Sequence, residues 1–175
     1  MNIPNLLTIF RLFLIPIFVL VFFSSSPNNL LLSIFVFFVA GFTDILDGYI
    51  ARKYKLVTDW GAAADPLADK LMLITVLTCL VLQNYLPLWV LLIILGKECF
   101  MIITGLLLYR KGTVIPSNIF GKISTVFFYL SIFVFAFHEV VGKYLIFLSV
   151  LFALVALINY SFFYMSNHKG LLTKK

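Results

Sequence analysis

Long apolar runs follow one another along this chain with only short breaks between them. Each run is close to the roughly 20 residues that a helix needs to cross a bilayer. Lipid offers the backbone no hydrogen-bond partners, and the runs lack the alternation of a membrane β-barrel, so each run is expected to be a helix. The sequence therefore predicts an all-α integral membrane protein with six transmembrane helices. The runs cover approximately residues 5–23, 30–52, 66–83, 86–109, 119–138 and 143–165.

Composition excludes a soluble domain and a nucleic-acid-binding protein. Of the 175 residues, 63% are hydrophobic and 11% are charged, whereas charged residues make up about 25% of soluble domains. The net charge of +6 suits attachment to an anionic lipid leaflet, and no solvated basic surface is left for a nucleic acid. Cys79 and Cys99 both lie in apolar runs, where we expect neither a disulfide nor a nucleophile. We expect one catalytic membrane domain over residues 1–175.

The distribution of Lys and Arg predicts the orientation in the membrane. Basic residues occupy the second and fourth breaks between the runs and the C-terminal tail, whereas the alternate breaks hold only Lys143. By the positive-inside rule, both termini and the acidic residues near the second break lie on the cytosolic side. The prediction is a multi-pass cell-membrane protein. The basic residues are Arg52, Lys53, Lys55, Lys70, Arg110, Lys111, Lys122, Lys169, Lys174 and Lys175.

A cleaved signal peptide is the alternative for the first apolar run. Residues 1–26 are apolar and are followed by small residues. However, no Lys or Arg precedes the run, and Arg11 lies inside it. We therefore expect the segment to be the first membrane helix.

Five of the seven acidic residues fall within residues 44–69. Asp44 and Asp47 are three residues apart, and Asp65 and Asp69 are four apart, so each pair shares one face of a helix. Crowded carboxylates repel one another unless a cation compensates them, and in an apolar protein this indicates a divalent-metal site with oxygen ligands. Four carboxylates can hold two ions, the arrangement that supports phosphoryl transfer.

The two pairs are expected on successive helices. Asp44 and Asp47 lie near the end of the second apolar run, and Asp65 and Asp69 open the third, so the loop between would fold the two acidic faces together. Asp59 falls outside both faces and is expected to be a solvated loop residue.

Small and basic residues accompany the acidic pairs. Gly48 directly follows Asp47, and Gly61 precedes Asp65 by four residues. A missing side chain admits a bulky ligand or a second backbone, although small residues also serve helix packing in membranes. Arg52 can meet a phosphate or anchor the chain at the cytosolic surface.

The spacing of these residues resembles the signature of the CDP-alcohol phosphotransferase (CDP-alcohol phosphatidyltransferase) family. The start of the chain, Asn2-Ile3-Pro4-Asn5-Leu6-Leu7-Thr8-x2-Arg11, is similar to the opening of bacterial phosphatidylglycerophosphate synthases in that family. So is the segment Asp65-Pro66-Leu67-Ala68-Asp69-Lys70. The signature reads Asp44-x2-Asp47-Gly48-x2-Ala51-Arg52-x8-Gly61-x3-Asp65-x3-Asp69.

The resemblance implies a role for each residue of the signature. Asp44, Asp47 and Asp65 would be metal ligands, and Asp69 would be both a partial ligand and the general base for the acceptor hydroxyl. The metal would be Mg²⁺ or Mn²⁺, with two ions expected. The implied CDP-binding residues are Asp44, Asp47, Gly48, Ala51, Arg52 and Gly61.

The implied reaction moves a phosphatidyl group from CDP-diacylglycerol to glycerol 3-phosphate and releases CMP. A cardiolipin synthase that uses phosphatidylglycerol as the acceptor is the alternative, followed by another CDP-alcohol phosphatidyltransferase. The family also implies a homodimer surrounded by membrane lipids. A cation transporter is a different class, but its site usually lies at mid-bilayer between internal repeats, and this chain shows no repeat.

The acceptor is expected to be chosen by residues outside the signature. Lys97 and Glu98 lie near the middle of the fourth run, where charges are costly and normally face a cavity or each other. Adjacent helical residues point about 100° apart, so the two need not pair. The phosphatidylglycerophosphate synthase branch implies Arg-Glu here and a further Arg some eight residues later, whereas this chain has Lys-Glu and Gly105.

Several polar residues remain candidates for binding an anionic acceptor. The basic residues after the fourth run resemble those of cardiolipin synthases at least as closely, and a cytosolic anchor is the alternative for each. Three residues of the first run share one face at spacings of three and could approach the site. His138 and Glu139 are expected at the opposite membrane face, without a catalytic role. The candidates are Asn5, Thr8, Arg11, Lys97, Arg110, Lys111 and Lys122.

Overall fold

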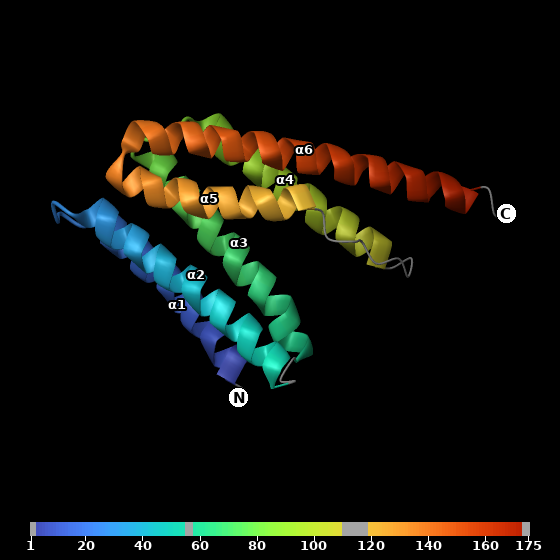
Figure 1. Cartoon of the computed structure of the whole chain (residues 1–175), viewed down its shortest axis with the longest axis horizontal. Coiled ribbons are helices and arrows are strands. Elements are labelled where there is room, and N and C mark those ends of the chain that lie inside the picture. Colours follow the sequence, from blue (N-terminus) through green and yellow to red (C-terminus); the bar gives the residue numbers. More distant parts are fainter. Residues whose placement is uncertain (1–2, 55–57, 110–118, 173–175) are drawn as a thin grey trace. The chain divides into compact units, whose positions relative to one another are not determined.

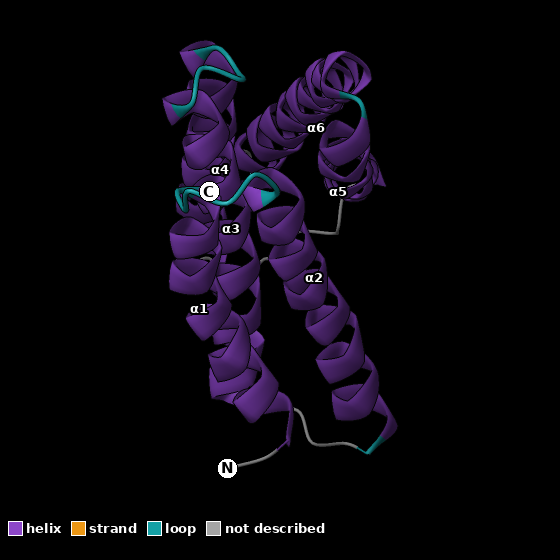
Figure 2. Ribbon diagram, turned by 90° about the vertical axis from the view of Figure 1, so that its left-hand side faces the viewer, coloured by secondary structure: helices purple, strands orange, loops and turns teal. Residues whose placement is uncertain are grey.

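The computed structural model describes residues 3–54, 58–109 and 119–172, and every regular element in these ranges is an α-helix (Figures 1 and 2). The number and type of the helices agree with the predicted runs, and α2 and α5 begin and end within one residue of them. The helices are α1 (Ile3–Phe22), α2 (Asn29–Lys53), α3 (Asp59–Leu82), α4 (Leu88–Tyr109), α5 (Ile119–Phe137) and α6 (Glu139–Leu172).

Three of the helices have the length and composition of a membrane span. Within the described residues, these segments are Pro4–Phe22 in α1, Asn29–Ala51 in α2 and Glu139–Asn159 in α6. A shorter apolar segment, Ile123–Phe137, lies in α5. The described part of the chain is thus all-helical, with candidate membrane-spanning segments in its first two helices and its last helix.

The start of α3 differs from the prediction. Thr58 adopts an extended backbone, and its hydroxyl accepts a hydrogen bond from the amide of Gly61 at 3.0 Å, which caps the helix. Asp59 is therefore the first helical residue instead of a loop residue, and Asp65 lies well inside the helix instead of opening it. Pro66 lacks only one amide donor, and α3 continues through it.

The described contacts divide the chain into two compact units, residues 1–87 and 88–175. The prediction of one catalytic domain concerns both units together and stays a prediction.

In the first unit, α1 packs against both α2 and α3, while α2 and α3 touch each other over a smaller area (Figure 1). The buried face of α1 carries Leu14, Phe18 and Phe22 along most of its length. Toward the start of α1 the same face becomes polar, with Thr8 and Arg11 buried. The buried face of α2 likewise passes from Phe37 to polar residues near its C-terminal end. The polar ends of the two faces meet, and the candidate site lies there.

In the second unit, α5 and α6 form a hairpin in which only His138 separates the two helices. Helices in lipid gain little from burying apolar surface, so close approach and interhelical hydrogen bonds stabilise them. The hydroxyls of Ser131 and Ser149 lie 3.1 Å apart, and the hydroxyl of Ser124 donates to the carbonyl oxygen of Ser149 at 3.1 Å. Gly142 allows the tightest approach, because a Cβ there would lie 2.7 Å from the backbone nitrogen of Phe135.

Replacing Gly142 with alanine should destabilise the hairpin. The added methyl group would meet backbone atoms of α5 that cannot rotate away, and overpacking of this kind costs about 1–3 kcal/mol. Thermal unfolding in detergent should report a lower midpoint for Gly142→Ala. Gly96→Ala is the matched control, since no described atom outside its chain neighbours and its own helix backbone lies within 4 Å of a Cβ at that position. An equal loss in both variants would contradict the close-approach explanation.

Candidate active site

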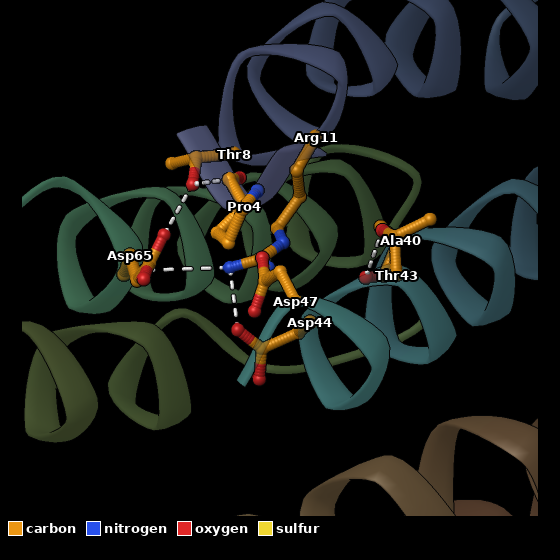
Figure 3. Close-up of polar contacts among 8 residues, drawn as sticks. All are labelled: Pro4, Thr8, Arg11, Ala40, Thr43, Asp44, Asp47 and Asp65. Atoms are coloured by element: carbon orange, nitrogen blue, oxygen red, sulfur yellow. Dashed lines mark hydrogen bonds and ion pairs between the residues drawn. The ribbon is translucent and has the colours of Figure 1, made fainter. Parts of the chain in front are cut away.

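The guanidinium group of Arg11 lies among the aspartates of the signature, Asp44, Asp47, Asp65 and Asp69, which are called the acidic cluster below. Arg11 reaches from α1 to α2, where its Nη1 lies 2.6 Å from Asp44 Oδ1 and its Nη2 pairs with Asp47 Oδ2. Nη1 also donates to the backbone oxygen of Asp65 in α3 at 3.5 Å. Figure 3 shows the guanidinium between the two helices that carry the aspartates. One α1 side chain thus links both halves of the signature.

Burial makes these ion pairs consequential. The side chains of Arg11 and Asp47 are 1% and 2% exposed, whereas that of Asp44 is 38% exposed. Removing one partner of a buried pair leaves an uncompensated charge and costs about 3–5 kcal/mol. The pair of Arg11 with Asp47 is therefore an internal anchor, while Asp44 keeps a face open to a ligand.

The acidic side chains of α2 and α3 are also coupled through space. Asp44 feels Coulombic repulsion from Asp65 and Asp69, and Asp47 feels it from Asp65. Four aspartates and one arginine give these five side chains a formal charge of 1 − 4 = −3. The cluster therefore retains an excess of negative charge that attracts further cations.

Thr8 joins α1 to the second acidic pair. Its hydroxyl lies within hydrogen-bonding distance of Asp65 Oδ1 and of the carbonyl oxygen of Pro4, at 3.1 Å in the latter case. A hydroxyl has one hydrogen, and the carboxylate is the stronger acceptor. Thr8 thus holds the Asp65 side chain beside α1.

A third contact from α1 lies at the start of α3. The Thr58 hydroxyl donates to Asn5 Oδ1 at 2.9 Å and accepts from the Gly61 amide. Gly61 is buried beneath this contact, since a Cβ there would lie 2.8 Å from Asn5 Oδ1. Asn5, Thr8 and Arg11 therefore all face the signature residues, as their spacing predicted.

The role of Thr58 was not predicted. Its signal is present in the sequence, because a threonine directly before an acidic residue is a typical helix start. This signal was outweighed by the interpretation of Pro66 as the start of the third helix.

The remaining signature residues are partly described. Asp69 is neither fully buried nor fully exposed, and Gly48 and Ala51 are in the same class on α2. Arg52 belongs to α2, but its side chain lies outside the described part of the structure.

The basic candidates beyond residue 87 belong to the second unit, and one of them has a described contact. Lys97 Nζ pairs with Glu98 Oε1 at 2.7 Å, with both side chains buried. The sequence left this pairing open, and the two side chains are long enough to bridge the angle between adjacent positions on the helix. Lys122 lies in α5 with its side chain outside the description, and Arg110 and Lys111 lie outside the described residues.

The donor set suits a hard divalent cation. Carboxylate, hydroxyl and carbonyl oxygens are the ligands that Mg²⁺ and Mn²⁺ prefer, and Asp44, Asp65 and Thr8 supply them here. In the described ranges, no three His, Cys, Asp or Glu side chains are grouped so that they could hold one ion. The guanidinium of Arg11 already compensates Asp44 and Asp47, so an incoming ion would share or replace this partner.

Comparison with known proteins defines the class of this chain. The profile of the CDP-alcohol phosphatidyltransferase family matches residues 1–155, and the chain belongs to that family. The match includes α1 to α5 and the whole acidic cluster.

The curated relatives of the chain carry closely related names. It is 38% identical over 138 residues to the CDP-diacylglycerol–glycerol-3-phosphate 3-phosphatidyltransferase of Bacillus subtilis, covering 71% of this chain and 70% of that protein. It is 49% identical to the protein of the same name from Haemophilus influenzae, over 46% of this chain and 43% of that protein. It is 35% identical to a probable phosphatidylglycerophosphate synthase of Mycobacterium tuberculosis, over 71% of this chain and 60% of that protein. The matched segments thus span between 43% and 70% of these three relatives.

Thr58→Ala should destabilise the start of α3 through loss of the helix cap. Replacing a capping threonine by alanine costs about 1 kcal/mol, and here the bond to Asn5 is lost as well. Thermal unfolding in detergent should show a lower midpoint for Thr58→Ala and a nearly unchanged one for Thr58→Ser, which keeps the hydroxyl. Equal midpoints for Thr58→Ala and the parent would show that the cap contributes nothing.

Proposed function

We propose that the chain transfers a phosphatidyl group from CDP-diacylglycerol to glycerol 3-phosphate and releases CMP. A hydroxyl oxygen of the acceptor attacks the phosphorus that carries the diacylglycerol. The new P–O bond forms as the bond to the CMP phosphate breaks, and CMP leaves with the bonding electrons. The observation that carries this proposal is the gathering of Asp44, Asp47 and Asp65 by side chains of α1. The names of the curated relatives support the choice of substrates.

The aspartates divide the work according to their exposure. Asp47 is buried against Arg11 and maintains the site, whereas Asp44 and Asp69 are accessible enough to meet substrates. Asp69 takes the proton of the acceptor hydroxyl as the oxygen attacks. The proposed metal is Mg²⁺ or Mn²⁺, and two ions would be held by Asp44, Asp47, Asp65 and Asp69. When bound, the metal neutralises charge on the phosphate groups.

Small residues of the signature leave room for the CDP group. Gly48 and Ala51 lie on the same helix as Asp44 and Asp47, whereas Gly61 is buried and would shape the CDP site only through the packing of α1 on α3. Arg52, on α2, would pair with a phosphate group. Arg110, Lys111 and Lys122 are proposed to attract the anionic acceptor, because their positive charges complement its phosphate. Lys97 would join them only by exchanging Glu98 for that phosphate.

The proposed topology has six membrane spans, with both termini and the acidic cluster on the cytosolic side of the cell membrane. Support comes from the lengths of α1, α2 and α6 and from the uneven distribution of Lys and Arg. A homodimer in contact with membrane lipids completes the proposal.

The activity is tested with purified protein in lipid nanodiscs that contain CDP-diacylglycerol. CMP release should depend on added glycerol 3-phosphate and on Mg²⁺ or Mn²⁺, and EDTA should abolish it reversibly; metal titration should saturate at two ions per chain. Asp69→Asn should lower kcat by roughly 10²–10⁴-fold, the usual contribution of a general base. Lys143→Gln, on an exposed pair with Glu139 in α6, is the control and should keep full activity. CMP release with phosphatidylglycerol but not with glycerol 3-phosphate would replace this proposal with cardiolipin synthesis.

The topology is tested by labelling single cysteines in a variant without Cys79 and Cys99. A cysteine at Tyr54, which is exposed just after α2, should react with an impermeant maleimide only after the cytosolic side is opened. Cysteines at Asn28 and His138, between α1 and α2 and between α5 and α6, should react in intact cells. The reverse pattern would invert the orientation and place the acidic cluster outside.

A further inference from the structure

The polar face of α1 touches the signature at three points. Asn5 accepts a hydrogen bond from Thr58 at the start of α3, and Thr8 bonds Asp65 further along the same helix. Arg11 forms ion pairs with both aspartates of α2. The three residues are spaced by three, so they form one stripe on the helix. Since α2 and α3 touch each other less than either touches α1, α1 is well placed to link the two acidic pairs, and this stripe does so through the bonds just given.

Burial separates this stripe from a substrate-binding surface. Thr8 and Arg11 are 0% and 1% exposed, and both terminal nitrogens of Arg11 are already used in ion pairs. Its Nε is buried and has no hydrogen-bond partner among the described residues. An acceptor phosphate could reach the guanidinium only by replacing the aspartates. The geometry therefore disfavours the acceptor-binding role that the sequence suggested for Thr8 and Arg11, whereas Asn5 is partly exposed and its amide oxygen is used by Thr58.

Gly61 has a local explanation in the same contact. Its Cβ would lie 2.8 Å from Asn5 Oδ1 and 3.0 Å from Thr58 Oγ1, so any side chain would compete with the bond between these two groups. The Asn5 side chain is short and could yield only by leaving Thr58. A glycine at this position thus preserves the packing of α1 against the start of α3.

We propose that Asn5, Thr8 and Arg11 are positioning residues that hold the aspartates in place before metal binds. Arg11 acts as the counter-cation of the aspartates, and Gly61 leaves space for the Asn5 side chain. This inference rests on the proposed function insofar as the aspartates are metal ligands. Arg11 compensates Asp44 and Asp47 in the metal-free protein, and a divalent ion competes with it for these carboxylates. The carboxylates are therefore in position before the metal arrives. Such positioning matters for rate, since misplacement of a reacting group by about 1 Å costs on the order of 100-fold.

The counter-cation role is tested by Mn²⁺ binding, followed through the EPR signal of free Mn²⁺ without any substrate. Arg11→Gln removes the competing charge, so its Mn²⁺ dissociation constant should fall on the order of tenfold. Its unfolding midpoint should drop in EDTA and recover more on Mn²⁺ addition than that of the parent, as ligand linkage requires. Arg11→Lys keeps the charge and should retain the parent affinity more closely. Equal or weaker Mn²⁺ binding by Arg11→Gln would overturn the role.

The contact between α1 and the start of α3 is tested by a double-mutant cycle that leaves Arg11 intact. This cycle remains informative if Arg11→Gln does not fold. Gly61→Ala should lower the unfolding midpoint in EDTA by on the order of 5 °C. In an Asn5→Ala background the same change should cost less, because the nearer obstruction is gone and only Thr58 Oγ1, at 3.0 Å, remains. An unchanged cost in that background would overturn the assignment of Gly61.

Thr8 supplies the third measurement. Thr8→Val removes the hydroxyl at nearly constant shape and should weaken Mn²⁺ binding, since Asp65 is no longer held, whereas Thr8→Ser should restore it. Thr78→Val is the matched control, because the Thr78 hydroxyl bonds only its own helix at Ile74 in the described contacts. Equal effects of Thr8→Val and Thr78→Val would refute positioning by Thr8. None of these measurements uses substrate, so they remain decisive even if no phosphatidyl transfer is found.

Discussion

The first unit depends on the ion pairs between one arginine and two aspartates. Helices in lipid gain little from hiding apolar surface from water, so a buried guanidinium with two carboxylate partners is among the strongest available constraints on how α1 and α2 meet. The charge cannot be left alone, and neither can Asp47, which is almost fully buried. Each group therefore fixes the position of the other. The aspartate cluster is both the proposed active site and part of the structural core of this unit.

This double role explains how a small membrane protein can keep acidic residues close together. Repulsion among Asp44, Asp65 and Asp69 opposes their approach, and the contacts from α1 offset it. Apolar packing by Leu14, Phe18 and Phe22 continues the same helix face deeper into the unit, so the polar and apolar contacts reinforce one another. The arrangement leaves Asp44 partly exposed, which is what a site for a phosphate-bearing substrate requires.

Helix number, helix type and the acidic faces were predictable, because they follow from local periodicity. The start of α3 was not, since the capping bond of Thr58 to the Gly61 amide outweighed the signal of Pro66. The spacing of Asn5, Thr8 and Arg11 predicted a shared face directed at the site. Their partners were beyond sequence reasoning, because these depend on α1 packing between α2 and α3. The pairing of Lys97 with Glu98 likewise depends on side-chain rotamers.

The change of the buried α1 face from polar to apolar residues has a consequence for biogenesis. The ribosome delivers α1 before α2 and α3, so Arg11 emerges from it before its carboxylate partners do. An arginine in a lone membrane helix costs about 2.5–3.5 kcal/mol at the helix centre and less when it reaches toward the interface. Pairing with Asp44 and Asp47 offsets this cost once α2 packs on α1, so the cluster that holds the candidate site together also contributes to keeping α1 in the membrane.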